Sequence, residues 1–262
     1  MARSAIMNVM VQAAMKAGRS LSRDFGEVQN LQVSLKGPAN YVSQANKRAA
    51  QIICNELQRA RPSYSFLIEQ INEIKGNDDQ HRFIASSLDS TINFLHGIPL
   101  FAISISLERQ RKVIASVIYN PVIDELFTAE RGCGAFLNDH RLRVSSRRNL
   151  FDSVIGTSIP HLRHSKHDHY LIELRSMMAE VSGIRCTGST ALDLAYVAAG
   201  RFDGFWENDP QNWNIIAAGV LMIREAGGFI SNKQGEEDVC INKSIVAGNE
   251  LVYNALMKIL KK

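Results

Sequence analysis

Residues 83–97, FIASSLDSTINFLHG, contain an apolar run, a tight polar turn and the predicted start of a helix. This order is typical of loops that bind phosphate and metal ions, because backbone N–H groups at a turn or a helix start attract anions. Metal-dependent phosphate chemistry usually needs several carboxylates, since Mg²⁺ prefers hard oxygen ligands. The segment holds one carboxylate, Asp89. It is therefore either an active site or the remainder of one.

Four more segments accompany this loop along the chain. They are SFLIEQ at 65–70, VIYNPVIDELFTAERGCGAFLN at 117–138, GSTALDLAYVAAGRFDGFWE at 188–207 and NWNIIAAGVLMIREAGG at 212–228. Five matches in a fixed order are specific evidence, although any one of them alone would be weak. Over nearly its whole length the sequence resembles the inositol monophosphatase family, and within that family the bacterial extragenic-suppressor (SuhB) type.

The resemblance implies a fold, a chemistry and a cofactor. The implied fold is a layered α/β sandwich with alternating α-β-α-β-α layers, usually in a homodimer. The implied chemistry is hydrolysis of a phosphate monoester of a small polyol or sugar, such as inositol 1-phosphate. The implied cofactor is Mg²⁺, which lowers the pKa of the attacking water and neutralises the developing charge.

Part of the family's metal site is retained. By resemblance, Glu69 and Asp89 match metal-binding carboxylates, and Leu88 matches a residue whose backbone carbonyl binds metal. Thr91 keeps the hydroxyl of the family's DGT motif and is the expected catalytic residue, whereas Ser90 replaces the Gly of that motif.

Four other positions of the implied site carry no carboxylate. Ser86 and Asn214 stand where the family has metal-binding Asp residues. Asn46 stands where an acidic residue orients the attacking water, and Gln70 replaces the second Glu of an EE pair. Neutral oxygens attract a divalent cation far less than carboxylates do, and an amide cannot take up a proton as a base. The metal cage is thus predicted to be largely dismantled, which would slow hydrolysis by roughly 10²–10⁴-fold or more.

The substrate-binding part of the implied site is predicted to be better preserved. By resemblance, the residues that contact substrate are Ser90, Thr91, Gly188, Ser189, Thr190 and Glu207. Backbone N–H groups at the turn before a helix expected from Asn93 onward could still hold a phosphate. Binding of anions and polyols is therefore predicted to outlast catalysis.

Two functions remain open at this point. One is a Mg²⁺-dependent phosphomonoesterase. The other is a non-catalytic binding or regulatory protein, because some relatives of the suppressor type bind transcription machinery and RNA-associated factors. His96 is a candidate acid or base, but a structural role at a helix start explains it equally. The run HLRHSKHDH at 161–169 suggests metal binding, although a solvated loop is the commoner explanation.

The elements that must position these residues follow from periodicity. Helices are predicted over residues 2–25 and 42–60, and they pack on a meandering sheet formed by the runs at 65–68, 83–85, 102–107, 113–119 and 126–129. After a polar, basic stretch at 145–152, strands and helices alternate, which favours layered α/β packing. Two subdomains, 1–150 and 151–262, are therefore predicted.

The composition excludes several classes of protein. A chain of 262 residues with 45% hydrophobic and 21% charged residues is ordinary for a globular protein. A net charge of +4 is too small to indicate nucleic-acid binding by itself. The four cysteines form no CxxC pair, which disfavours zinc and favours reduced thiols. No run has transmembrane length or the apolar core of a signal peptide, so a cytoplasmic protein without a membrane partner is predicted.

Overall fold

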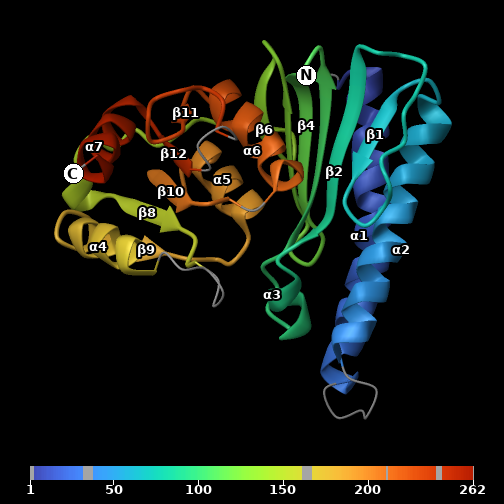
Figure 1. Cartoon of the computed structure of the whole chain (residues 1–262), viewed down its shortest axis with the longest axis horizontal. Coiled ribbons are helices and arrows are strands. Elements are labelled where there is room, and N and C mark those ends of the chain that lie inside the picture. Colours follow the sequence, from blue (N-terminus) through green and yellow to red (C-terminus); the bar gives the residue numbers. More distant parts are fainter. Residues whose placement is uncertain (1–2, 32–37, 161–166, 211, 240–243, 262) are drawn as a thin grey trace.

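Within the described residues, 3–31, 38–160, 167–210, 212–239 and 244–261, helices and sheets alternate in five layers (Figure 1). The computed structural model thereby confirms the predicted α-β-α-β-α sandwich. The helices are α1 (Ala5–Leu31) and α2 (Pro38–Ala60) in one outer layer, α5 (Thr190–Ala198) and α6 (Trp213–Glu225) in the middle layer, and α4 (His167–Met178) and α7 (Glu250–Leu260) in the other outer layer.

The first sheet lies between the α1–α2 pair and the middle layer. In space its strands follow their order in the sequence, from β1 to β7. They are β1 (Ser65–Ile68), β2 (His81–Asp89), β3 (Ala102–Arg109), β4 (Lys112–Asn120), β5 (Glu125–Glu130), β6 (Gly134–Leu137) and β7 (His140–Arg141). Neighbouring strands are antiparallel except β1 and β2, which are parallel. The carboxyl ends of β1 and β2 therefore lie side by side.

The second sheet lies between the middle layer and the α4–α7 layer, and its strand order is β11-β12-β10-β8-β9. Its strands are β8 (Val154–Thr157), β9 (Gly183–Arg185), β10 (Gly204–Asn208), β11 (Phe229–Ser231) and β12 (Ser244–Gly248). Strands β8 and β10 are parallel, so their carboxyl ends share one edge. Two short elements complete the chain: the helix α3 (Thr91–Leu95) after β2 and the 3₁₀ turn η1 (Leu150–Asp152) before β8.

Small side chains let α1 approach the first sheet closely. Ala13, Ala14 and Ala17 are fully buried on the helix face that contacts the sheet and α2. A Cβ at Gly18 would lie 2.5 Å from the ring of Tyr119 in β4, so this position has no room for a side chain. The apolar stripe from which this helix is predicted is therefore also the surface by which α1 packs on the first sheet and α2.

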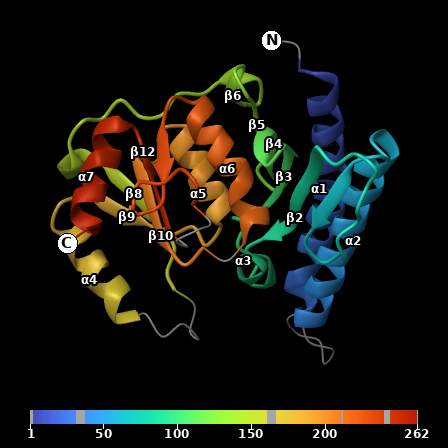
Figure 2. The same ribbon diagram turned by 45° about the horizontal axis from the view of Figure 1, so that its top comes forward.

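The middle layer is apolar on nearly all sides because a sheet covers each of its faces. Figure 2 shows α5 and α6 between the two sheets. The two helices cross at Gly219 of α6, where an added Cβ would lie 2.5 Å from the Cβ of Leu194 in α5. A helix that is hydrophobic all round is expected to be buried, and both helices fit this rule.

Four predicted boundaries are corrected by the structure. The second helix, predicted from residue 42, begins at Pro38. The strand predicted at 83–85 is β2, which continues to Asp89, with an irregular register between Ser86 and Asp89. The helix expected from Asn93 is α3, which begins at Thr91 and has five residues. The first helix does not end at residue 25 but continues to Leu31. Pairing of β2 with buried β3 overrides the turn preference of Ser and Asp, and a bulge accommodates the mismatch.

The predicted division of the chain at residue 150 lies between the two sheets. The first sheet ends at Arg141 and the second begins at Val154. That the two halves act as separate subdomains stays a prediction. Among the helices the structure describes, none combines the length and apolar character needed to cross a membrane.

Replacement of Gly by Ala should have opposite effects on stability at the crossing of α5 and α6 and at an open position of α1. Gly219→Ala forces a Cβ against Leu194 and should lower the free energy of unfolding by about 1–3 kcal/mol. Gly26→Ala in α1 meets nothing within 4 Å and should raise it by up to about 1 kcal/mol, since Ala favours the helix. Urea unfolding of the two variants checks this, and equal shifts would contradict the packing described here.

Candidate functional site

A cavity of about 420 Å³ opens where strand ends from both sheets meet the N-termini of α5 and α6. The first sheet contributes Glu69, directly after β1, and Asp89 at the end of β2. The second sheet contributes Glu207 in β10 and Ser158 directly after β8. Strand ends in layered α/β proteins commonly gather such side chains into one site.

Asp89 is held by hydrogen bonds from the start of α5. Its Oδ2 accepts hydrogen bonds from the hydroxyl of Ser189 at 2.7 Å and from the backbone N–H of Ala191 at 2.8 Å. Burial raises the pKa of Asp89 to about 6, although the hydrogen bonds lower it; the charge of Glu69 raises it further. The carboxylate thus joins β2 to the first turn of α5.

Two serine hydroxyls donate hydrogen bonds to side-chain oxygens of the implied metal site. The family resemblance implies that these oxygens would bind metal or water. Ser86, at a position of a metal-binding Asp, is fully buried and donates a hydrogen bond of 2.6 Å to Oε2 of Glu69. Ser87 donates a hydrogen bond of 2.5 Å to Oδ1 of Asn46, where the family has an acidic residue. Each contact gives one oxygen, Oε2 of Glu69 or Oδ1 of Asn46, a hydroxyl donor from the protein.

Two more buried carboxylates lie on the side of the second sheet. Glu207 accepts hydrogen bonds from Oγ1 of Thr190, the nearer at 3.1 Å. Burial raises the pKa of Glu207 to about 7; hydrogen bonds from Thr190 and Ser158 lower it, and the charge of Asp89 raises it. Asp193 accepts a hydrogen bond of 2.8 Å from Thr187, and burial raises its pKa well above the usual value.

Asn93 fixes the distance between the two walls of the pocket. Its Nδ2 donates to the carbonyl of Leu100 at 2.6 Å and to the carbonyl of Thr187 at 2.8 Å. Gly188 has a φ of +80°, and a Cβ there would lie 3.2 Å from the Asn93 amide, so Gly suits this close approach. Sequence reasoning did not assign a role to Asn93, Asp193 or Thr187, although Asn93 and Asp193 lie in the quoted motifs.

The structure gathers most of the predicted site residues. The pocket is lined by Glu69, Leu88, Asp89, Ser90, Thr91, Gly188, Thr190 and Glu207. Ser189 does not line the pocket itself. It is buried and donates a hydrogen bond to Asp89. Asn46 and Gln70 instead line an adjoining cavity of about 270 Å³, which shares Thr91 with the first.

Three predicted features lie outside the pocket lining. Asn214 is buried in the first turn of α6, where its backbone N–H donates to Oδ1 of Asn212. His96 is exposed and ends α3, with its backbone N–H bonded to the carbonyl of Ile92. Of the histidine-rich run at 161–169, residues 161–166 lie outside the described residues, and α4 begins at His167.

The side chains present do not fit a magnesium cage. Mg²⁺ demands near-octahedral oxygen ligands, chiefly carboxylates and water. The two retained carboxylates, Glu69 and Asp89, already accept hydrogen bonds from protein groups. Across the described ranges, no group of three or more Asp, Glu, His or Cys side chains could hold a metal ion. No catalytic step can therefore be derived through Mg²⁺ from this donor set.

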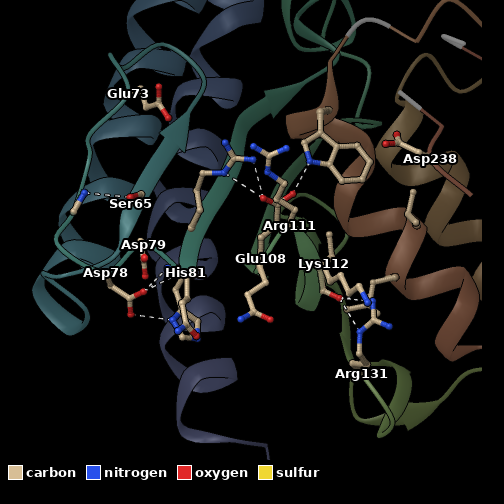
Figure 3. A pocket seen from close by; sticks show the side chains of 18 of the residues that line it. Ser65, Glu73, Asp78, Asp79, His81, Glu108, Arg111, Lys112, Arg131 and Asp238 are labelled. Carbon is tan, nitrogen blue, oxygen red and sulfur yellow. Dashed lines mark hydrogen bonds and ion pairs between the residues drawn. The ribbon is translucent and has the colours of Figure 1, made fainter. Parts of the chain in front are cut away.

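A larger cavity, of about 1080 Å³, lies at the opposite ends of β1, β2 and β3 (Figure 3). Its central carboxylate, Glu108, accepts hydrogen bonds from Arg82 at 2.8 Å and from Nε1 of Trp213 at 2.9 Å. None of the predicted site residues lines it. We therefore regard the smaller, carboxylate-lined pocket as the candidate site.

The fold and the pocket between its sheets define the class of layered α/β proteins that includes the phosphatases of small phosphate esters. Within this class, the chain belongs to the inositol monophosphatase family, whose profile matches residues 2–262. Members of this family generally depend on Mg²⁺ and bind phosphorylated substrates. The similarity therefore extends over the whole layered fold.

Individual relatives are similar over nearly their whole length. A Mesorhizobium japonicum protein named inositol-1-monophosphatase is 64% identical over 262 residues, covering 100% of this chain and 98% of that protein. The Nus factor SuhB of Pseudomonas aeruginosa is 37% identical over 256 residues, covering 96% of this chain and 94% of that protein. The crystal structure of extragenic suppressor protein suhB from Bartonella henselae is 64% identical, with a TM-score of 0.92 and 99% of each chain covered.

The raised pKa of Glu207 predicts a specific dependence of stability on pH. Between its ordinary value of 4.5 and about 7, the folded protein retains a proton that the unfolded chain releases. Stability should therefore fall as the pH rises through this window, by up to about 3 kcal/mol from this group. Glu207→Gln removes this loss, so the variant should unfold at a higher temperature than the wild type at pH 8.

The control for this experiment is Glu73→Gln, which changes an exposed carboxylate. Thermal unfolding at pH 4 and pH 8 should show a pH-dependent gain for Glu207→Gln alone. An advantage of equal size at both pH values would contradict the role of burial.

Proposed function

We propose that this protein is a family member that has lost Mg²⁺-dependent phosphate-ester hydrolysis and has kept a pocket for a small polyol. The contact that carries the proposal is the hydrogen bond from Ser86 to Glu69. In this contact the neutral hydroxyl of Ser86 donates to the carboxylate of Glu69. The family resemblance implies a metal-binding Asp at the position of Ser86. The retained pocket, with Thr190 and Glu207 on one wall, supports the binding part of the proposal.

Loss of charge is central to this proposal. A metal-binding cluster of carboxylates repels itself when the metal leaves, which costs stability. Ser86, Asn46, Gln70 and Asn214 are neutral, and two of them take part in hydrogen bonds with their side chains. The chain should accordingly fold without Mg²⁺.

A second candidate function is hydrolysis of inositol 1-phosphate or a similar sugar phosphate. It is favoured by the 64% identity to a protein named inositol-1-monophosphatase and by the retained Glu69, Asp89, Thr91 and Glu207. The donor set described above argues against it, because two carboxylates remain where the resemblance implies several.

For the biological role, we propose that the protein acts through binding, as a homodimer. The 37% identity to a protein named Nus factor SuhB favours a partner in the transcription machinery. Such a partner would not require hydrolysis. Size-exclusion chromatography with light scattering tests the dimer, and a monomer at micromolar concentration would contradict it.

Release of inorganic phosphate from inositol 1-phosphate tests the loss of hydrolysis. With millimolar Mg²⁺, the wild type should release no more phosphate than Asp89→Ala. The combination Ser86→Asp, Asn214→Asp and Asn46→Asp restores carboxylates and should raise the rate at least 10²-fold, since each decade corresponds to about 1.4 kcal/mol. Mg²⁺-dependent release by the wild type that Asp89→Ala abolishes would overturn the proposal.

Thermal unfolding tests the metal independence directly. Millimolar Mg²⁺ should leave the melting temperature of the wild type unchanged within about 1 °C, because weak ligands bind the folded state little. Addition of Mg²⁺ should stabilise the variant with Ser86→Asp and Asn214→Asp by several degrees. Replacing Asn214→Asp by Asn212→Asp, which keeps the number of added charges, provides the control and should reduce the response. A large Mg²⁺ shift in the wild type would count against the proposal.

A further inference from the structure

The larger cavity, of about 1080 Å³, lies apart from the candidate pocket and has a different lining. None of the described residues lines both cavities. The larger one lies between the loop that follows β1, the hairpin that joins β3 to β4, and one side of α6 (Figure 3). Its volume is slightly above the range of about 300–1,000 Å³ that is common for small-molecule sites. It therefore has room for a ligand of that size.

Cations gather where the β3–β4 hairpin and the end of β5 line this cavity. Arg111 and Lys112 come from the hairpin, and Arg131 directly follows β5. All three residues are exposed, and across the described residues none of them forms an ion pair with a carboxylate. Arg224 of α6, by contrast, pairs with Glu237. The charges of the first three are therefore available to a ligand.

The guanidinium of Arg131 is held in a fixed orientation. Its Nε and Nη2 donate to the carbonyl of Val113 at 3.1 Å and 2.9 Å. These two bonds leave Nη1 available as a donor. A planar guanidinium that is already oriented can bind phosphate oxygens with little further loss of conformational freedom.

The hairpin turn carries long polar side chains at two positions that favour glycine. Gln110 has a φ of 50° and Arg111 a φ of 62°, and both residues line the cavity. Two positive φ angles suit the twist of a two-residue hairpin turn, but Asn-Gly is the preferred sequence because larger side chains are strained there. Strain of this kind is concentrated at functional sites. The turn therefore presents Arg111 to the cavity at a cost in stability.

An aromatic ring lines the same cavity. Trp213, the first residue of α6, is half-buried, and its Nε1 donates to Glu108 at 2.9 Å. Arg82 forms an ion pair with this buried carboxylate at 2.8 Å. The hydrogen bond to Glu108 orients the indole, and Val220 and Leu221 add apolar atoms to the lining. The cavity thus combines a ring surface with cations.

The acidic residues of the lining restrict the size of the anion that fits. Figure 3 places Glu73, Asp78 and Asp79 on the side of β1, across the cavity from Arg131. Asp238 lies on the side of α6 and already takes part in an interaction within the protein. A long polyanion such as a nucleic acid would pass these carboxylates and be repelled. The distribution of charge therefore favours a compact anion.

We propose that the larger cavity binds a nucleoside polyphosphate, with the phosphates at Arg111, Lys112 and Arg131 and the base at the ring of Trp213. Guanidinium and ammonium groups bind phosphate oxygens, and nucleobases stack readily on aromatic side chains. A nucleoside diphosphate supplies both parts in one small molecule. Because the two cavities share no lining residue, the inference does not depend on the proposed function.

Tryptophan fluorescence tests the inference when ADP, adenosine or pyrophosphate is added in the presence of EDTA. The chain has two tryptophans, and Trp206 is fully buried, so a change in emission on binding reports on Trp213. We expect ADP to bind at least about tenfold more tightly than adenosine or pyrophosphate, since only ADP contacts both the ring and the cations. Failure of ADP to bind at millimolar concentration would overturn the inference. Equal affinity for adenosine would contradict the role of the cations, and equal affinity for pyrophosphate that of the ring.

A matched pair of charge reversals tests where ADP binds. Lys112 lines the cavity, Lys258 lies in α7, and both are exposed. Lys112→Glu should weaken ADP binding at least about tenfold, whereas Lys258→Glu should change it less than about twofold, because solvent and salt screen a distant charge. Neither change should impair folding, since both side chains are on the surface. Wild-type affinity in Lys112→Glu would overturn the inference.

Arg111→Gly separates binding from folding. Gly adopts a positive φ without steric cost, so the variant should unfold at a temperature no lower than that of the wild type. Its affinity for ADP should nevertheless fall at least about fivefold, because one guanidinium is lost. Thermal unfolding and fluorescence titration of the same protein measure both effects. Unchanged affinity would contradict the role of Arg111, and so would a loss of affinity that is accompanied by a lower melting temperature.

Discussion

The carboxylate of Asp89 is the contact on which the site depends. It ends a strand of the first sheet and accepts hydrogen bonds from Ser189 and Ala191 at the start of α5, which packs under the second sheet. Because the group is buried, these donors are needed to offset its desolvation. One ionisable side chain thereby fixes the relative position of the two pocket walls, together with the amide of Asn93.

The same arrangement gives each of the two retained carboxylates, Glu69 and Asp89, a hydrogen-bond donor from the protein. A buried carboxylate needs partners, and either a cation or hydrogen-bond donors can provide them. In this chain the hydroxyl of Ser86 donates to Glu69, while the hydroxyl of Ser189 and the backbone N–H of Ala191 donate to Asp89. The hydroxyls of Ser86 and Ser189 and the N–H of Ala191 are therefore engaged within the protein.

The layers themselves do not depend on this chemistry. The cores on the two sides of the first sheet are formed by apolar side chains, and positions such as Gly219 are set by helix crossing. Close similarity over the whole chain to an inositol-1-monophosphatase and to a Nus factor SuhB is consistent with this separation. A fold can be retained while the function of its site diverges.

Much of the architecture and of the site's membership could be predicted from the sequence. Periodic apolar residues indicated the long α1 and α2, and five ordered motifs indicated the layered fold and the positions of Glu69, Asp89 and Glu207. The loss of acidic residues at Ser86 and Asn214 is likewise a matter of residue type alone. Local patterns suffice for these features because they depend on neighbouring residues or on a shared motif.

Tertiary structure decided which distant groups the site residues contact. Ser189 and Asp89 are 100 positions apart in the chain, and Asn93 and Thr187 are 94 apart. The continuation of β2 through Ser86 to Asp89 likewise depends on pairing with β3. The sequence by itself determined the fold class and the neutral residues of the site. Only the folded chain decided that Asp89 accepts hydrogen bonds from Ser189 and Ala191 at the N-terminus of α5. The physical reason is that hydrogen bonds between distant segments follow from packing, and local residue patterns carry no record of them.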